Sequence, residues 1–465
     1  MKISNICCIG AGFVGGPTMS VIALKCPEIK VTVVDINREK IKLWNGDLNN
    51  LPVYEPGLSE IVSKVRNVNL FFSTDIDKAI NEAQIVFLAV NTPTKESGEG
   101  KGYAADLTYI ENSAKHLAKV AKSNKIVVEK STLPVRTAER LKEVINANKK
   151  ENVNFEIISN PEFLAEGTAI NDLFKSDRVL IGGDNTSSGK SAVNALVNIY
   201  KKWIPVNKIL KTNVWSSELS KLVSNAMLAQ RISSINSISA ICEQTGANIE
   251  EVSRAIGMDS RIGPHFLKSS IGFGGSCFKK DILNLVYISR LYGLNEVASY
   301  WESVVDINYY QTERFGQKII SCMSDKNSIL TILGWSFKKD TNDSRESASI
   351  YLAKKILLKG YKIKIYDPMV DKNKIHDDIK SLIDKDNDEI ELINDKIQIF
   401  DSPYEAFKDS NICAICTEWD EFKDLEWTEI YKSMNKPSWV CDGRNILEKT
   451  KLEKIGFKTF FIGQS

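Results

Sequence analysis

A glycine-rich turn near the amino terminus most constrains the fold. An apolar run at residues 6–9 predicts a short buried strand, and Gly10–Gly15 follow it at once in a G-x-G-x-x-G pattern before a helix-like stretch. A second apolar run, at residues 31–34, ends at Asp35. Such a turn lets the backbone approach a pyrophosphate, and a carboxylate after the next strand accepts hydrogen bonds from ribose hydroxyls. The pattern predicts a dinucleotide-binding domain that favours NAD over NADP, with a glycine-rich packing turn as the structural alternative.

The amino-terminal half predicts a parallel sheet. Strand-like apolar runs alternate with helical patterns, which is typical of βαβ units. After the second strand, these runs lie at residues 84–90, 125–128, 155–158 and 179–181. We therefore expect one doubly wound domain over residues 1–214.

The remaining chain predicts a helical region and then a second α/β domain. Between residues 215 and 324 the strands give way to long amphipathic stretches that suit helical linkage and dimerisation. Residues 325–465 then repeat the amino-terminal order, with a strand at 329–333, a helix at 347–358 and a strand at 362–366. The predicted fold class is α/β, with two Rossmann-like doubly wound domains joined by a helical central region. Residues 371–396, rich in charge and Asn, predict a solvated surface insertion.

Charge and cysteine content argue against several protein classes. The 465 residues carry 61 Lys and Arg against 59 Asp and Glu, a net charge of +2, which gives no electrostatic reason to expect a nucleic-acid or membrane-surface partner. No apolar run approaches the ~20 residues of a spanning helix. Nine scattered cysteines argue against a disulfide framework, and Cys413 and Cys416 lie in an apolar run that predicts a core strand. We expect a soluble cytosolic protein with no metal site.

Polar loops follow several predicted strands. The segments are 90–94 (VNTPT), 129–132 (EKST) and 160–167 (NPEFLAEG). Ligands of open α/β sheets bind beyond the carboxyl ends of strands, so these loops are candidates for cofactor or substrate contact. Glu162 and Glu166 could share a helical face, and one could act as a general base. Plain loops and a surface helix start are the alternatives.

The helical region carries two further motifs with reactive groups. Three glycines in residues 272–275 are costly unless the backbone bends sharply or approaches a ligand, and Cys277 just beyond them is a candidate nucleophile. Lys221 and Asn225 are i,i+4 neighbours that could orient a hydroxyl or hold an oxyanion. A flexible loop with an incidental thiol and a solvated lysine are the alternatives. In the third region, basic residues at strand ends, such as Lys338 and Arg444, suit the phosphates of a second nucleotide.

These motifs, in this order, resemble the UDP-glucose/GDP-mannose dehydrogenase family over residues 6–461. The matching segments are GAGFVGGP, VNTPT, STLPVR, SNPEFLAEGTAI, SSELSKL, GFGGSCF, FKKDTNDSRESASI and ICTEWDEF. The resemblance implies NAD-dependent four-electron oxidation of UDP-glucose to UDP-glucuronate, through a thiohemiacetal and a thioester on Cys277 and with two NAD per product. Open alternatives are another nucleotide sugar (GDP-mannose or a UDP-N-acetylhexosamine), a two-electron β-hydroxyacid-type dehydrogenase, and a non-catalytic nucleotide sensor.

The resemblance also implies roles for individual residues. The catalytic set is Cys277, Lys221, Glu162, Asp281, Asn225 and Thr132. NAD would contact Gly10, Ala11, Gly12, Phe13, Val14, Gly15, Asp35, Lys40, Val90, Asn91, Thr92, Pro93, Thr94, Ser131, Thr132, Glu166 and Arg345. UDP-glucose would contact Glu162, Phe163, Leu164, Ala165, Glu166, Lys221, Asn225, Arg261, Lys268, Ser269, Ser270, Ile271, Gly272, Phe273, Gly274, Phe337, Lys338 and Arg444.

Four positions bear on assembly and on departures from the family pattern. Arg261 resembles an arginine that reaches a neighbouring subunit's substrate site, which implies a homo-oligomer, either a dimer or a dimer-based hexamer. Lys279 stands where glutamine is common and Lys40 where arginine is common, so both substitutions keep or add positive charge. Asn445 stands where a second arginine is common, so the edge of the uracil-side contact departs from the family pattern.

Overall fold

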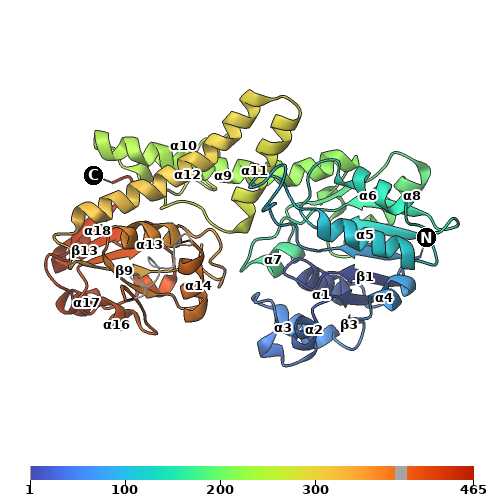
Figure 1. The fold of residues 1–465 in the computed structure, drawn as a ribbon, viewed down its shortest axis with the longest axis horizontal. Coiled ribbons are helices and arrows are strands. Elements are labelled where there is room, and N and C mark those ends of the chain that lie inside the picture. Colours follow the sequence, from blue (N-terminus) through green and yellow to red (C-terminus); the bar gives the residue numbers. More distant parts are fainter. Residues whose placement is uncertain (1, 383–394, 465) are drawn as a thin grey trace. The chain divides into compact units, whose positions relative to one another are not determined.

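The computed structural model describes residues 2–382 and 395–464. They form two compact units, shown as a ribbon in Figure 1. The first unit contains the chain up to Ser224 together with Leu283–Tyr292, and the second contains Asn225–Ile282 and the chain from Gly293 onward. Two helices, α9 (Val214–Thr245) and α11 (Ser276–Leu291), therefore contribute residues to both units.

The first unit is built on an eight-stranded sheet in the order β3-β2-β1-β4-β5-β6-β7-β8. Its strands are β1 (Asn5–Ile9), β2 (Lys30–Val34), β3 (Leu70–Ser73), β4 (Ile85–Leu88), β5 (Lys125–Glu129), β6 (Phe155–Ser159), β7 (Val179–Gly182) and β8 (Ile209–Thr212). Neighbouring strands pair in parallel, except that β6 and β7 meet at one antiparallel bridge. The strand order reverses between β1 and β4, and ligands of doubly wound sheets bind at such a switch point.

Helices cover both faces of this sheet because its central strands are apolar on both sides. In β1, Ile6 and Cys8 pack into one cluster, and Cys7 and Ile9 pack into the other. The first cluster includes residues of α1 (Gly15–Lys25), α3 (Leu58–Val65) and α8 (Ser187–Tyr200). The second includes residues of α4 (Ile76–Glu82), α5 (Thr108–Val120) and α6 (Thr137–Asn146). The helices α2 (Arg38–Asn45) and α7 (Ala169–Phe174) also belong to this unit. Near-continuous apolar strands of this kind are typical of parallel sheets.

The second unit has a six-stranded parallel sheet in the order β11-β10-β9-β12-β13-β14. Its strands are β9 (Ile329–Leu333), β10 (Lys362–Tyr366), β11 (Ile397–Ile399), β12 (Ile412–Ile415), β13 (Trp439–Asp442) and β14 (Lys458–Phe461). Its helices are α10 (Ile249–Gly257), α12 (Asn295–Cys322), α13 (Ala348–Leu358), α14 (Lys372–Leu382), α16 (Pro403–Phe407), α17 (Trp427–Ser433) and α18 (Lys449–Ile455). Side chains of α12, α13 and α14 pack on one face of the sheet, and those of α16, α17 and α18 on the other.

The predicted fold class is confirmed: two doubly wound sheets are accompanied by long helices from the middle of the chain. Cys413 and Cys416 are fully buried on β12 and at its end, as the core interpretation predicts. The surface insertion at 371–396 is wrong for its first part, because α14 buries Ile375 and Ile379 in the core. Residues 383–394 of that insertion lie outside the described residues. The domain limits at 214 and 324 stay a prediction.

Glu218, a buried carboxylic acid on α9, caps the start of α6 and lies beside a second buried carboxylic acid, Glu129. Glu218 accepts hydrogen bonds from the backbone N–H groups of Arg136 (2.6 Å) and Ala138 (2.8 Å), so a side chain from α9 caps α6. Glu129 is fully buried at the end of β5 beside it. Burial raises the pKa of Glu218 to about 7, and burial together with the neighbouring carboxyl raises the pKa of Glu129 well above its usual range. The folded protein therefore holds a proton between these residues.

We predict that this pair makes the free energy of unfolding fall as the pH rises from about 4.5 to about 7. In that window the unfolded chain releases protons that the folded chain keeps, and the shift of Glu218 alone corresponds to a fall on the order of 3 kcal/mol. Glu129→Gln should remove most of this fall, because its amide donates to the Glu218 carboxylate without a proton. Urea unfolding between pH 5 and pH 8 measures it. The exposed Glu151 supplies the control, since Glu151→Gln should keep the wild-type slope. An unchanged slope in Glu129→Gln would contradict the prediction.

Candidate active site

The three glycines of the turn after β1 differ in the space around them. A Cβ atom at Gly10, where φ is +110°, would lie 2.3 Å from the carbonyl oxygen of Ala89, and one at Gly15 would lie 2.0 Å from the carbonyl oxygen of Gly10. Neither position therefore accepts a side chain. Gly12 differs, because a Cβ atom there would meet nothing within 4 Å. The backbone at Gly12 faces open space at the switch point of the sheet, so the turn fits a pyrophosphate.

Asp35 stands at the end of β2, beside this turn. Its Oδ2 accepts hydrogen bonds from the Ala11 N–H (3.0 Å) and from Lys40 Nζ (3.1 Å), and its Oδ1 accepts one from the Asn37 N–H (2.9 Å). Burial alone would raise the pKa of Asp35, but the two backbone N–H groups and Lys40 outweigh burial and lower it. Asp35 is thus an oriented carboxylate, which suits ribose hydroxyls. The residues that are present fit a dinucleotide.

Other predicted cofactor residues lie at the same edge of the sheet. Ser131 Oγ donates to the carbonyl oxygen of Val90 (2.6 Å), and Thr92 Oγ1 donates to that of Thr132 (3.0 Å). These bonds fasten the loop after β4 to the loop after β5. The structure therefore brings the 90–94 and 131–132 segments together. Arg345 belongs to the second unit, where it forms a two-point ion pair with Asp343.

A buried ion pair joins Glu162, in the loop after β6, to Lys221 on α9. Glu162 Oε1 lies 2.9 Å from Lys221 Nζ, and Glu162 Oε2 accepts a hydrogen bond from the Leu164 N–H (2.6 Å). Burial alone would raise the pKa of Glu162, but Lys221, the Leu164 N–H and Lys130 lower it. Glu162 is therefore held as a carboxylate, which can accept a proton. The shared helical face of Glu162 and Glu166 is wrong, since residues 160–165 are not helical and α7 begins only at Ala169.

Sequence reasoning gave no individual role to Lys130, which lies behind this pair. The side chain is buried, and its Nζ donates to Asn160 Oδ1 (3.2 Å). Burial lowers the pKa of Lys130 to about 8, against the opposing effect of Glu162. Asn160 also accepts a hydrogen bond from Tyr200 Oη (2.8 Å). A buried second cation beside Glu162 is visible only once the loops after β5 and β6 are placed side by side, so spacing in the sequence gave no signal for it.

In the second unit, Cys277 occupies the first turn of α11. Its thiol is exposed, and the unpaired N–H groups of a helix start favour a thiolate at such a position. Asp281 lies one turn further along the same helix and is almost fully buried, and its Oδ2 accepts a hydrogen bond from Asn225 Nδ2 of α9 (2.6 Å). Three predicted catalytic residues are thus linked within this unit. Glu162, Lys221 and Thr132 belong to the first unit.

The glycine loop before Cys277 packs closely against Phe337 and the backbone of Glu346. A Cβ atom at Gly274 would lie 2.6 Å from the carbonyl oxygen of Glu346, and one at Gly275 would lie 3.0 Å from the Phe337 ring. The Gly275 N–H donates to the carbonyl oxygen of Arg345 (2.8 Å). The structure therefore brings the loop against the predicted substrate residue Phe337, and close packing, together with positive φ at Gly272 and Gly275, accounts for the glycines.

Three polar side chains of α12, Asn308, Gln311 and Thr312, hydrogen-bond to the backbone of the same loop. Asn308 accepts from the Phe273 N–H (2.8 Å) and donates to the Phe273 carbonyl oxygen (3.0 Å). Gln311 donates to the carbonyl oxygen of Ser270 (2.7 Å), and Thr312 to that of Ile271 (2.9 Å). Sequence reasoning missed these residues. Their i, i+3, i+4 spacing on an amphipathic helix was the available signal.

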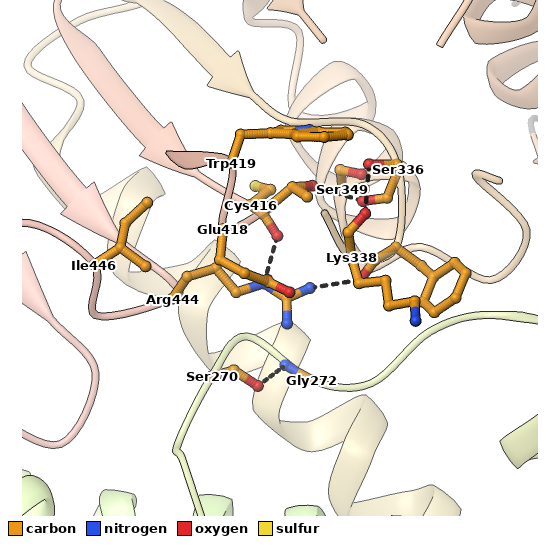
Figure 2. Close-up of polar contacts among 12 residues, drawn as sticks. Ser270, Gly272, Ser336, Lys338, Ser349, Cys416, Glu418, Trp419, Arg444 and Ile446 are labelled. Carbon is orange, nitrogen blue, oxygen red and sulfur yellow. Dashed lines mark hydrogen bonds and ion pairs between the residues drawn. The ribbon is translucent and has the colours of Figure 1, made fainter. Parts of the chain in front are cut away.

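Arg444, just after β13, bonds to backbone oxygens at the end of β12 and in the 337–338 segment, and Figure 2 shows Arg444 close to Cys416 and Lys338. Its Nε donates to the carbonyl oxygen of Cys416 (2.7 Å), its Nη2 donates to that of Phe337 (3.0 Å), and Glu418 pairs with it at 3.2 Å. Phe337, Lys338 and Arg444, three of the predicted substrate residues, therefore form one cluster. Asn445, the departure from the family pattern, is nearly buried and donates to Ser269 Oγ and the Ile462 carbonyl oxygen.

Arg261, the predicted intersubunit residue, is highly exposed and pairs with Asp259 (2.6 Å). Lys279 pairs with Glu346 (2.8 Å). Over residues 2–382 and 395–464, no helix is long and apolar enough to cross a membrane. Within the same described residues, no group of three or more His, Cys, Asp or Glu side chains is placed to hold a metal ion.

Comparisons with known proteins agree along the whole chain. Three models of the UDP-glucose/GDP-mannose dehydrogenase family match in order: the NAD binding domain at residues 4–204, the central domain at 215–310 and the UDP binding domain at 331–449. A Drosophila melanogaster protein named UDP-glucose 6-dehydrogenase is 55% identical over 99% of this chain and 96% of its own length. Arabidopsis thaliana UDP-glucose 6-dehydrogenase 1 is 52% identical over 99% of this chain and 97% of its own length.

The fold has a counterpart among solved structures. A UDP-glucose dehydrogenase from the archaeon Pyrobaculum islandicum superimposes with a TM-score of 0.84 at 26% identity, covering 100% of this chain and 98% of that chain. The predicted family resemblance is confirmed. The chain therefore belongs to the UDP-glucose/GDP-mannose dehydrogenase family, and it is an oxidoreductase whose cofactor is NAD.

Proposed function

We propose that this enzyme oxidises UDP-glucose to UDP-glucuronate through covalent intermediates on Cys277. The observation that carries the proposal is the exposed thiol at the start of α11, on the same helix as buried Asp281 and next to the loop that packs against Phe337. The choice of UDP-glucose as substrate rests on the names of relatives that match this chain over almost its full length. A second nucleotide-type sheet with basic residues at its strand ends suits a UDP-sugar.

The proposed reaction has two oxidations and one hydrolysis. In each oxidation, C6 of the sugar would lose one hydride, which NAD held at the turn after β1 would accept, and the oxygen on C6 would release its proton to water. After the first, the Cys277 thiolate adds to the aldehyde carbon, and the oxygen takes up a proton to give a thiohemiacetal. The second oxidation leaves a thioester. Water then attacks the carbonyl carbon, the C–S bond breaks, Cys277 leaves as a thiolate, and the sugar retains a carboxylate.

The charges in the two units suggest how the other groups divide this work. We assign Lys221 to stabilise negative charge that develops on the C6 oxygen, with Asn225, one turn further along α9, as a second donor. Glu162 is assigned as the base that activates the hydrolytic water, because its lowered pKa keeps it ionised. Thr132 would support this water. Asp281 would orient Asn225 through their 2.6 Å hydrogen bond. A dimer or dimer-based hexamer and a cytosolic location stay predictions.

We predict that Gly12→Ala weakens NAD binding without unfolding the protein. The new methyl group meets no protein atom, and φ at Gly12 lies outside the left-handed region, so the melting temperature should stay at the wild-type value. The methyl group would enter the space proposed for the pyrophosphate and should weaken binding by about tenfold or more, which is about 1.4 kcal/mol. Titration calorimetry with NAD checks it. Wild-type NAD affinity in Gly12→Ala would contradict the assignment of this turn.

We also predict two NADH per UDP-glucuronate, counted by absorbance against product identified by mass. Cys277→Ser should lower complete turnover by roughly a thousandfold or more, as loss of a nucleophile does, because a hydroxyl is a poorer nucleophile and a poorer leaving group. Cys322→Ser, which removes a thiol at the end of α12, is the matched control and should keep wild-type turnover. A yield of one NADH per product, or an active Cys277→Ser enzyme, would sink the covalent route.

A further inference from the structure

We propose that Arg178 is a positioning residue that fixes the Phe163 ring and, through it, the Glu162–Lys221 ion pair. Arg178 precedes β7 and has no role in the reaction proposed above. Its guanidinium carbon lies 3.8 Å from the centroid of the Phe163 ring. Phe163 directly follows Glu162, so whatever holds this ring also holds the backbone that presents the carboxylate. The inference rests on the proposed function, since it concerns the same site.

Arg178 joins three segments of the first unit. Its stack on Phe163 reaches the loop after β6, and its Nη2 donates to Ser224 Oγ of α9 (2.9 Å). Ser224 lies three residues after Lys221 on that helix, so the two are neighbours on successive turns. Lys221 Nζ lies 5.4 Å from the centroid of the same Phe163 ring. Two cations therefore contact one ring, and one of them is the partner of Glu162.

The chemistry of the guanidinium group explains why arginine suits this position. A planar delocalised cation stacks on an aromatic face and still offers N–H groups at its rim, which an ammonium group does not. Arg178 is half-buried, and burial lowers its pKa. The stack on Phe163 and the bond to Ser224 offset the cost of removing this cation from water.

A cavity of about 270 Å³ borders the stack. Its lining includes Lys130, Glu162, Phe163, Lys175, Arg178 and Tyr200. Truncation of Arg178 would enlarge this space beside the Phe163 ring, and the ring and the Glu162 loop would gain freedom to move into it. The same space would admit a small planar cation from solution.

The experiment is chemical rescue of Arg178→Ala, with wild-type enzyme assayed in parallel. We expect Arg178→Ala to lose about tenfold or more in kcat/KM for UDP-glucose. The acidic limb of its pH profile should move to higher pH, because a looser Lys221 lowers the pKa of Glu162 less. Millimolar guanidinium chloride should restore much of the lost rate, whereas urea, which has the same shape without the charge, should not. The affinity for NAD should stay at the wild-type value.

Two further variants keep the test decisive. Lys175→Ala removes a cation from the lining of the same cavity without touching the Phe163 stack, and it should keep wild-type kinetics. If Arg178→Ala does not fold, Arg178→Lys retains the charge but not the planar stack and should show the same loss with a normal melting temperature. If the wild type is active and Arg178→Ala has the same kcat/KM, the inference is overturned. A loss of kcat/KM in Arg178→Ala that guanidinium does not restore would also overturn it. A wild type that reduces no NAD with UDP-glucose would instead overturn the proposed function.

Discussion

The buried ion pair between Glu162 and Lys221 is the interaction on which the polar cluster of the first unit depends. Only 8% of the glutamate side chain and 4% of the lysine side chain are exposed. Removing such charges from water costs several kcal/mol each, so the pair exists only because further polar groups surround it. The Leu164 N–H and the charge of Lys130 do this for Glu162. The pair then holds the loop after β6 against α9, and it places side by side the carboxylate and the ammonium group that are proposed for the acid–base chemistry.

The two sheets share a hydrogen-bond pattern between an aspartate and a turn, but the aspartate lies in different surroundings in each. In each, a carboxylate after the second strand in chain order, Asp35 or Asp367, accepts hydrogen bonds from the turn after the first strand. Asp35 serves an open glycine turn and pairs with Lys40 at the surface. Asp367 is buried and also accepts from the indole of Trp419 (3.2 Å), so its oxygens are engaged within the protein. The turn after β9 thus keeps this hydrogen-bond pattern but has Gly334 as its one glycine, and the residues proposed to contact the nucleotide there are Phe337, Lys338 and Arg444.

Much of this arrangement could be predicted because its signals are local. Apolar strands, the glycine turn and Asp35 follow one another within one βαβ unit, and β9, β10 and α13 match their expected limits within one residue. The interactions that were missed join distant segments. Glu129 meets Glu218 and Lys130 lies beside Glu162 only after the sheet has formed. The charged stretch that begins at 371 misled because α14 is amphipathic: its charges face outward while Ile375 and Ile379 enter the core.

The two glycine-rich segments look alike in the sequence, but their glycines have different surroundings in the structure. The sequence predicts approach to a ligand for the turn at 10–15, and either a sharp bend or approach to a ligand for the loop at 272–275. In the first, Gly12 faces open space, which agrees with a ligand, whereas Gly10 and Gly15 are excluded by backbone atoms. In the second, Gly274 and Gly275 abut Glu346 and Phe337. Those glycines act indirectly, because they let the loop that leads to Cys277 lie flat against the segment proposed to hold the nucleotide. A side chain at Gly274 or Gly275 would meet Phe337, so a substitution there would displace both Phe337 and the segment that leads to Cys277, the proposed nucleophile.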